Sequence, residues 1–340
     1  MQKLALDEEI LLQIEQPARY IGGEINSVIK DPNKVKLRFA MCFPDVYEIG
    51  MSHLGIQILY SMFNRREDVY CERVFSPWTD LDRILREKKI PLFTLESQRP
   101  VRECDFLGIT LQYEMCYTNI LQVLELSEIP LRATDRRESD PIVIGGGPCT
   151  YNPEPIAPFF DLFYMGEGEV IYDQLLDLYL AHKEAGGDRI SFLKKAAALP
   201  GIYVPSLYEP RYREDGTLSS FEPLCPEAPA SVRRLVMSVL DRADFIDTPL
   251  VPFIRVTQDR SVLELMRGCI RGCRFCQAGN VYRPQREHSV EYLKRYAEKL
   301  LKITGNEEIS LSSLSSSDYS RLQEFLEYLI QYTKERKINI

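Results

Sequence analysis

The segment SVLELMRGCIRGCRFCQAG, residues 261–279, places three cysteines directly after a short apolar run. The run predicts a strand, and Cys269, Cys273 and Cys276 follow it with the spacing C-x3-C-x2-C. Three thiolates this close together suit a soft metal centre, because thiolate ligands favour iron–sulfur clusters, zinc and copper(I). We therefore predict that these three cysteines are metal ligands.

Two other interpretations of the cysteines stay open at this point. Positions i, i+4 and i+7 would share one face of a helix and could simply pack there, although Gly268 and Gly272 favour a wrapping loop. A zinc site would need a fourth ligand, and His288 is the candidate for a Cys3His site.

Strand and helix patterns continue downstream of the cysteines. We predict a helix at 290–304, a strand at 307–314 and a helix at 322–337, and Ile338 to Ile340 look like the first residues of a further strand. Two such repeats and a strand start cannot close a barrel. We therefore expect the chain to end inside its second domain.

The N-terminal half repeats a strand-then-helix pattern. An apolar run at 35–43 precedes a stretch from His53 to Phe63 with helical spacing of its apolar residues, and the same succession recurs as far as residue 185. Strands that alternate with helices imply an α/β fold with a parallel sheet. The predicted domains are a helix and extended arm at 1–34, a sheet domain at 35–185, a hairpin and proline-rich linker at 186–258, and an incomplete second domain at 259–340.

Composition excludes several classes of protein. A chain of 340 residues with 45% hydrophobic and 27% charged residues is globular, and a net charge of −8 argues against a sequence-independent grip on nucleic acid. The nine cysteines do not form a disulfide framework, because six are scattered singly. The first residues lack the pattern of a signal peptide and there is no long apolar run, so we expect a cytoplasmic protein without a membrane partner.

The motif C-x3-C-x-aromatic-C after the first strand of a βα repeat resembles the signature of the radical S-adenosylmethionine superfamily. The resemblance implies that Cys269, Cys273 and Cys276 hold a [4Fe–4S] cluster, that S-adenosylmethionine binds to it, and that a 5′-deoxyadenosyl radical forms. It also implies an electron donor of flavodoxin or ferredoxin type. Phe275 would lie beside the cluster with its backbone near the adenine, although ordinary core packing explains it equally well.

In that family the second strand ends in a loop that meets the methionyl amino group. Here the loop reads SLSSLSSSDY, which places Ser315, Ser317 and Asp318 at this position. Their oxygens could accept hydrogen bonds from an ammonium group. A serine-rich turn that caps the following helix is the alternative.

Upstream, the pattern GGGP…PE…FD…GEGE from residue 145 resembles the cobalamin-binding domain attached to one class of these proteins. The resemblance implies that Gly145, Gly146 and Gly147 leave room for the corrin, whereas a tight turn without a ligand is the alternative. Mutase-type cobalamin domains carry Asp-x-His-x-x-Gly. Asp45, Tyr47 and Gly50 occupy that spacing here with tyrosine in the histidine position, so bound cobalt would have no histidine ligand.

Over its whole length the chain resembles an uncharacterised bacterial branch of cobalamin-binding-type radical S-adenosylmethionine proteins. The implied fold is a Rossmann-like parallel sheet followed by the first βα units of a partial TIM barrel. The implied activity is radical methyl or methylthio transfer, with cobalamin as the methyl carrier. A non-catalytic zinc or iron–sulfur module and an inactive fragment of the enzyme stay open. An unknown substrate, RNA or protein, is expected. Residues 231–302 carry 14 Lys and Arg against 8 Asp and Glu, and this local positive charge could face RNA, although solvated surface charge is the commoner explanation.

Overall fold

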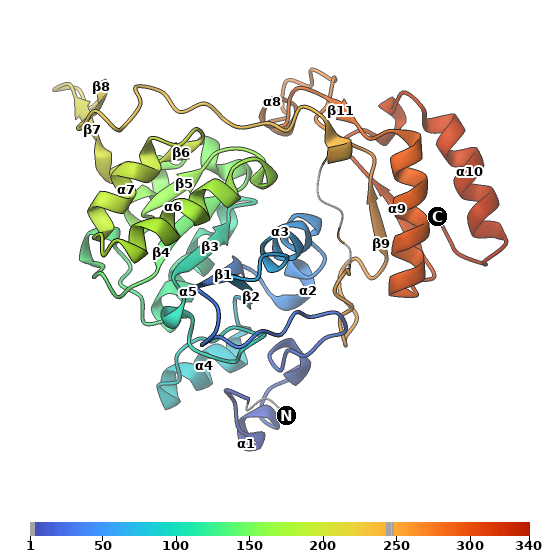
Figure 1. The fold of residues 1–340 in the computed structure, drawn as a ribbon, viewed down its shortest axis with the longest axis horizontal. Coiled ribbons are helices and arrows are strands. Elements are labelled where there is room, and N and C mark those ends of the chain that lie inside the picture. Colours follow the sequence, from blue (N-terminus) through green and yellow to red (C-terminus); the bar gives the residue numbers. More distant parts are fainter. Residues whose placement is uncertain (1–3, 243–245, 247) are drawn as a thin grey trace. The chain divides into compact units, whose positions relative to one another are not determined.

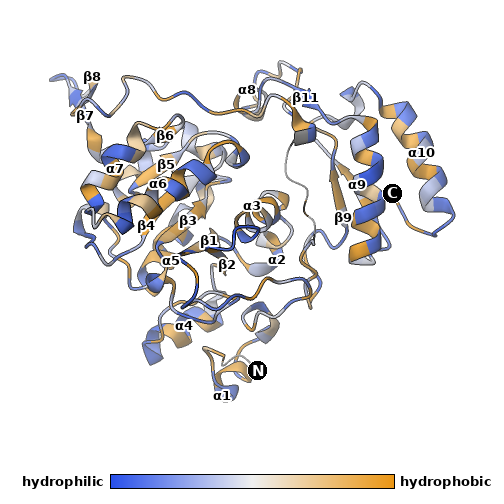
Figure 2. Cartoon of the chain, in the orientation of Figure 1, coloured by the Kyte–Doolittle hydropathy of each residue, from blue (hydrophilic) through white to orange (hydrophobic). Residues whose placement is uncertain are grey.

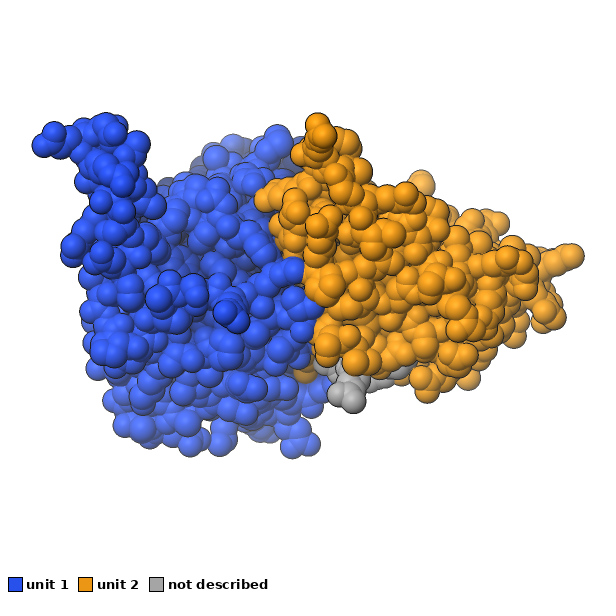
Figure 3. All heavy atoms as spheres, turned by 90° about the horizontal axis from the view of Figure 1, so that it is seen from above, with its two compact units in different colours: residues 1–23, 28–50, 63–236 blue, residues 24–27, 51–62, 237–340 orange. Residues whose placement is uncertain are grey.

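The computed structural model describes residues 4–242, 246 and 248–340, and these form two compact units (Figure 3). Unit 1 consists of Met1–Gly23, Val28–Gly50 and Phe63–Val236, and unit 2 of Glu24–Ser27, Met51–Met62 and Met237–Ile340. Among the described residues, no helix combines the length and the apolar character that crossing a membrane requires.

Unit 1 is built on a six-stranded sheet with the order β2-β1-β3-β4-β5-β6 (Figure 1). The first five strands are parallel and β6 joins β5 in the antiparallel direction. This confirms the predicted α/β fold with a parallel sheet, while the antiparallel edge strand was not foreseen. The strands are β1 (Leu37–Phe43), β2 (Val69–Phe75), β3 (Phe106–Thr110), β4 (Ile142–Gly146), β5 (Leu162–Tyr164) and β6 (Ile202–Tyr203).

All residues of β1, β2 and β3 are buried, which explains why their sequences are nearly continuous apolar runs. An aromatic cluster packs on one face of the sheet: the ring of Phe39 meets those of Phe106 at 5.6 Å and Tyr172 at 6.3 Å. The helices that connect the strands are α2 (Tyr47–Gly50), α3 (Leu54–Asn64), α4 (Thr79–Lys88), α5 (Tyr117–Leu126), α6 (Tyr172–Glu184) and α7 (Arg189–Ala197), and α1 (Glu8–Leu11) precedes the sheet.

The strand order reverses between β1 and β3, because the chain adds β2 on one side of β1 and β3 on the other. In open α/β sheets the loops after two such strands diverge and leave a crevice beyond their carboxyl ends. We call the residues that follow β1, β3 and β4, at the carboxyl ends of these strands, the sheet edge.

A buried ion pair supports β2. Arg73 Nε lies 2.6 Å from Glu96 Oε1, and both side chains are 0% exposed. Glu96 Oε2 also accepts from the Arg73 backbone N–H, and Leu95 N–H donates to the Arg73 carbonyl. The segment around Glu96 thereby satisfies backbone groups that an edge strand would otherwise leave open.

The predicted hairpin is confirmed as β7 (Tyr208–Tyr212) and β8 (Leu218–Pro223), which pair in the antiparallel direction. Gly216 in the connecting turn has φ 80°, a conformation that glycine adopts without strain.

Unit 2 contains two parallel strands, β9 (Ser261–Glu264) and β12 (Ile309–Ser312), and an antiparallel pair, β10 (Met266–Arg267) and β11 (Arg286–Glu287). Its helices include α8 (Ala278–Val281), α9 (Val290–Thr304) and α10 (Leu322–Lys334). Figure 2 shows hydrophobic and hydrophilic residues alternating around α9 and α10, as expected for helices with one buried face. Asn339 forms an isolated parallel bridge with Glu308, among the residues for which the sequence predicts the start of a further strand.

Candidate metal centre

The three cysteines lie on a loop between β10 and α8. Gly268 begins the loop with φ 86°, and an added Cβ there would lie 2.6 Å from the carbonyl oxygens of Pro284 and Tyr282. Residues 268–276 contain no helix or strand, so the interpretation that the cysteines pack on one helix face is wrong. Cys273 is exposed, and Cys269 and Cys276 are half-buried.

The three thiols of the loop are not in disulfide bonds, because all nine cysteines of the chain are free. The structure does not bring the three sulfur atoms together at metal-binding distances: within the described residues, no group of three His, Cys, Asp or Glu is arranged to hold an ion. The donor set nevertheless fits an iron–sulfur cluster chemically, since three thiols share one accessible loop without regular structure.

Five of the six cysteines of unit 1 differ from those of the loop. Cys42, Cys71, Cys104, Cys116 and Cys149 are buried, and burial raises the pKa of Cys149 to about 11. A buried thiol with a raised pKa stays protonated at neutral pH and is a poor metal ligand.

The loop after β12 faces the cysteine loop through an ion pair. Asp318 Oδ2 accepts from Arg271 Nε at 2.7 Å and from the Ser315 hydroxyl at 2.7 Å. These hydrogen bonds lower the pKa of Asp318. Ser317 lies with Asp318 in a turn of 3-10 helix, Ser316–Asp318. The interpretation that these serines cap α10 is wrong, because α10 begins after Arg321 without a side-chain cap.

Phe275 and His288 differ in their exposure to solvent. Phe275 is 93% exposed, so ordinary core packing does not explain it. His288 is 3% exposed, stacks on Tyr292 at 4.1 Å and places Nδ1 3.1 Å from Asp241 Oδ1. The described residues show no metal-binding group around His288, so the arrangement gives a Cys3His zinc site no support.

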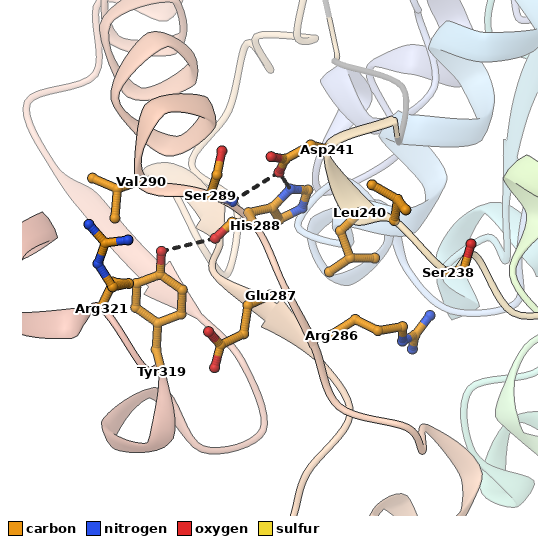
Figure 4. Close-up of a pocket in the computed structure, with 11 residues that line it drawn as sticks. Ser238, Leu240, Asp241, Arg286, Glu287, His288, Ser289, Val290, Tyr319 and Arg321 are labelled. Atoms are coloured by element: carbon orange, nitrogen blue, oxygen red, sulfur yellow. Dashed lines mark hydrogen bonds and ion pairs between the residues drawn. The ribbon is translucent and has the colours of Figure 1, made fainter.

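A pocket of about 380 Å³ adjoins this histidine (Figure 4). Asp241, His288, Tyr319, Arg286 and Arg321 are among its lining residues. The polar groups are already used within the chain: Asp241 accepts from Ser289 N–H at 3.0 Å, and the Tyr319 hydroxyl donates to the His288 carbonyl at 2.9 Å. We therefore interpret the pocket as a structural feature, lined where the segment at Asp241 contacts the start of α9.

At the sheet edge the motif residues have roles in packing. Tyr47 is 1% exposed and meets the Phe75 ring at 5.4 Å, so it lies in the core of unit 1. An added Cβ on Gly50 would lie 2.2 Å from the Phe75 ring, and one on Gly145 would lie 2.6 Å from Phe163. These two glycines are required by neighbouring side chains whether or not a ligand binds.

Among the other motif residues at the sheet edge, Gly146 has more space than Gly147. An added Cβ on Gly146 would lie 3.6 Å from the Tyr172 hydroxyl, an ordinary contact, while Gly147 has φ 109° and lies close to the Leu111 carbonyl. The Asp45 carboxylate accepts a hydrogen bond from the Tyr113 hydroxyl. Burial and this bond together raise the pKa of Tyr113.

Sequence reasoning missed Thr110, the last residue of β3. Thr110 is 8% exposed, and its hydroxyl has no hydrogen-bond partner among the described residues. Its neighbour across the sheet is Gly146. A polar residue at the end of a buried strand beside a glycine-rich strand end was the signal that could have identified it.

Two family comparisons match the chain in succession. Residues 55–205 match the family described as radical SAM proteins, N-terminal, and residues 263–340 match the radical SAM superfamily. SAM denotes S-adenosylmethionine. The matches together span about two thirds of the chain, which therefore belongs to the radical SAM proteins.

A curated relative is the uncharacterized protein MJ0966 of Methanocaldococcus jannaschii, which is 24% identical over 300 residues. That alignment covers 85% of this chain and 52% of the relative, so the chain spans about half the length of the curated relative it matches.

Two solved structures of the radical S-adenosylmethionine methyltransferase TsrM from Kitasatospora setae are also similar, each at 14% identity and over 88% of this chain. One contains cobalamin and a [4Fe–4S] cluster and gives a TM-score of 0.48 over 53% of that protein. The other contains tryptophan and a SAM analogue and gives 0.45 over 52%.

Proposed function

We propose that this protein is a radical SAM enzyme whose Cys269, Cys273 and Cys276 hold a [4Fe–4S] cluster. The observation that carries the proposal is the contrast among the cysteines: three accessible thiols share one irregular loop, while five others are buried in unit 1. Three protein ligands would leave one iron open for S-adenosylmethionine. The cluster, when bound, supplies the electron that cleaves the sulfonium bond of that molecule.

The residues around the loop suit S-adenosylmethionine. Asp318 supplies a carboxylate, and Ser315 and Ser317 supply hydroxyls, beyond the end of β12; together they would accept hydrogen bonds from the methionyl ammonium group. Phe275 exposes its ring on the same loop as the cysteines, where it would cover the bound molecule and exclude water. These contacts are part of the proposal.

We further propose that the sheet edge binds cobalamin. The Thr110 hydroxyl, buried without a partner among the described residues, offers one hydrogen bond to such a ligand. The loops after β1, β3 and β4 expose large apolar side chains that suit a flat macrocycle: Ile49, Tyr113, Met115 and Tyr151. Asn119 Nδ2 donates to the Pro44 carbonyl at 3.0 Å, so the first turn of α5, which follows β3, contacts the loop after β1.

No histidine would ligate cobalt in this proposal. Tyr47 lies in the core, and His53 Nδ1 accepts from Ile56 N–H at 3.3 Å at the start of α3. With a methyl carrier and a radical generator in one chain, methyl or methylthio transfer to an unreactive carbon is the proposed reaction. RNA or protein is the proposed class of substrate, and a flavodoxin or ferredoxin the proposed electron donor.

The test is the formation of 5′-deoxyadenosine by full-length protein, purified and reconstituted without oxygen, given S-adenosylmethionine and a reductant. The expected result is 5′-deoxyadenosine above the level of a variant with all three loop cysteines replaced by alanine. Equal amounts from both proteins would reject the proposed function. Cobalt analysis of protein incubated with cobalamin tests the second cofactor separately.

A further inference from the structure

The loop from Cys269 to Cys276 has little support of its own. Its internal hydrogen bonds run from Arg271 N–H to Cys269 Sγ at 3.4 Å and from Cys276 N–H to the Cys273 carbonyl at 3.1 Å. An added Cβ on Gly272 would meet nothing within 4 Å. A loop with so few contacts does not by itself fix where three sulfur atoms lie.

One ion pair ties this loop to another segment. Arg271 Nε donates to Asp318 Oδ2 at 2.7 Å, and Arg271 Nη2 donates to Oδ1, so the guanidinium grips the carboxylate with two bonds. Within the part of the chain that the structure describes, no other hydrogen bond or ion pair links residues 269–276 to the rest. Planar, two-bond pairing fixes direction as well as distance, which a lysine would not do.

The Asp318 end of the pair is well anchored. Its carboxylate accepts from the Ser315 hydroxyl, its N–H donates to the Ser315 carbonyl at 2.9 Å, and its side chain is 10% exposed. The next residue, Tyr319, is buried and donates its hydroxyl to the His288 carbonyl. Arg271, by contrast, is 60% exposed and sits on the irregular loop. The pair therefore connects a firmly held turn to a loosely held loop.

We propose that Asp318 is a positioning residue for the metal centre: acting through Arg271, it holds the cysteine loop in the arrangement that receives the cluster. The identity of the metal group rests on the proposed function, but the tether itself does not. Arg271 donates its backbone N–H to Cys269 Sγ and its guanidinium N–H to Asp318, so its positive charge would reduce the repulsion between the ligand thiolates and the Asp318 carboxylate.

The experiment measures how fast each loop cysteine of metal-free full-length protein reacts with iodoacetamide, with mass spectrometry to separate the sites. Cys273 is already exposed and serves as the internal reference, while half-buried Cys269 reports on the loop. Asp318→Asn and Arg271→Gln should each raise the Cys269 rate relative to Cys273, by about threefold to tenfold. The double variant should match the single ones, because both remove the same contact.

Arg274→Gln is the matched control: the same substitution in the same loop, at an arginine outside the tether. It should leave the ratio unchanged. Arg271→Lys should restore the ratio in part, and the exchanged pair Arg271→Asp with Asp318→Arg should restore more of it. An equal effect of Arg274→Gln, or additive effects of the two single substitutions, would overturn the proposal.

A second readout uses protein reconstituted with iron and sulfide. The electron paramagnetic resonance signal of the reduced cluster should broaden or shift in Asp318→Asn and stay unchanged in Arg274→Gln, since only the first alters how the thiols are held. An identical signal in all three proteins would contradict a positioning role. The alkylation assay needs no iron, so the two claims are tested separately. If no cluster binds, the proposed function is rejected, and the alkylation rates still test the ion pair between Arg271 and Asp318.

Discussion

The cysteine loop and the sheet edge both contain glycines next to candidate ligand-binding residues, but the space around those glycines differs. At the sheet edge an added Cβ on Gly145 would lie 2.6 Å from the Phe163 ring, whereas on Gly272 of the cysteine loop it would meet nothing within 4 Å. Packing therefore requires glycine at position 145 of the sheet edge and at position 268, where the cysteine loop begins, but it does not explain Gly272 within that loop. A glycine that packing does not require is stronger evidence for a ligand or metal site.

The largest expected effect separates the cysteines of the two regions. Replacing Cys269, Cys273 or Cys276 by alanine should abolish the brown cluster absorption of anaerobically purified protein, because each provides one ligand. Cys225→Ala, at a cysteine that is half-buried like Cys269, should leave the absorption intact. Loss of the absorption in Cys225→Ala as well as in the loop variants would contradict the assignment of only the loop cysteines as cluster ligands.

The next effect compares two arginine–carboxylate pairs. Glu96→Ala should cost about 3–5 kcal/mol of stability, because it removes a buried carboxylate that pairs with the buried Arg73 guanidinium at 2.6 Å. Asp318→Asn should leave global stability unchanged, since Arg271 is 60% exposed and stays hydrated. Urea unfolding followed by the fluorescence of Trp78, the single tryptophan, reports on unit 1, which contains the buried pair, and circular dichroism reports on the whole chain, including Asp318 in unit 2. A midpoint for Glu96→Ala equal to that of exposed Glu87→Ala would contradict this account.

A smaller effect tests the glycines directly. Gly145→Ala should destabilise unit 1 by about 2 kcal/mol, because the new methyl group overlaps the Phe163 ring. Gly272→Ala is the matched substitution and should leave the unfolding midpoint where it was. If Gly145→Ala proved harmless while lowering cobalamin binding, the glycine would serve the ligand and not the core.

The smallest effect concerns pH in unit 2. Burial acts to raise the pKa of Asp241, but its hydrogen bonds with Ser289 and His288 prevail, so the pKa is lowered. A lowered folded-state pKa means that Asp241 stabilises the fold above its unfolded pKa of about 4 and loses that contribution as pH falls through the folded value. Asp241→Asn should therefore flatten the acid side of the stability profile, measured by circular dichroism. An unchanged acid limb would refute the assignment.

The sequence predicted the elements that depend on local periodicity. The strands of the parallel sheet, the helices from α3 to α7, the helices α9 and α10 and the hairpin follow from apolar spacing and turn residues, and they lie where expected; the short helix α8 was not predicted. The short strands β6, β10 and β11 were missed, because two residues carry no periodicity and pair only through tertiary contacts.

The candidate site was predicted in its residue types but not in its contacts. C-x3-C-x2-C identified the loop, yet nothing in the spacing shows that Arg271 reaches Asp318, 47 residues away. The spacing of Tyr47 suggested a ligand position, but a tyrosine followed by apolar residues is equally suited to burial, and the structure buries it. Long-range pairing and burial are set by the fold and not by local pattern.

The most direct test of the central claim is the metal content of the unmodified full-length protein, purified without oxygen and reconstituted. We predict about four iron and four acid-labile sulfide ions per chain and little zinc, as a [4Fe–4S] cluster on three cysteines requires. Stoichiometric zinc without sulfide, or no bound metal at all, would contradict the account that the loop from Cys269 to Cys276 is an iron–sulfur site.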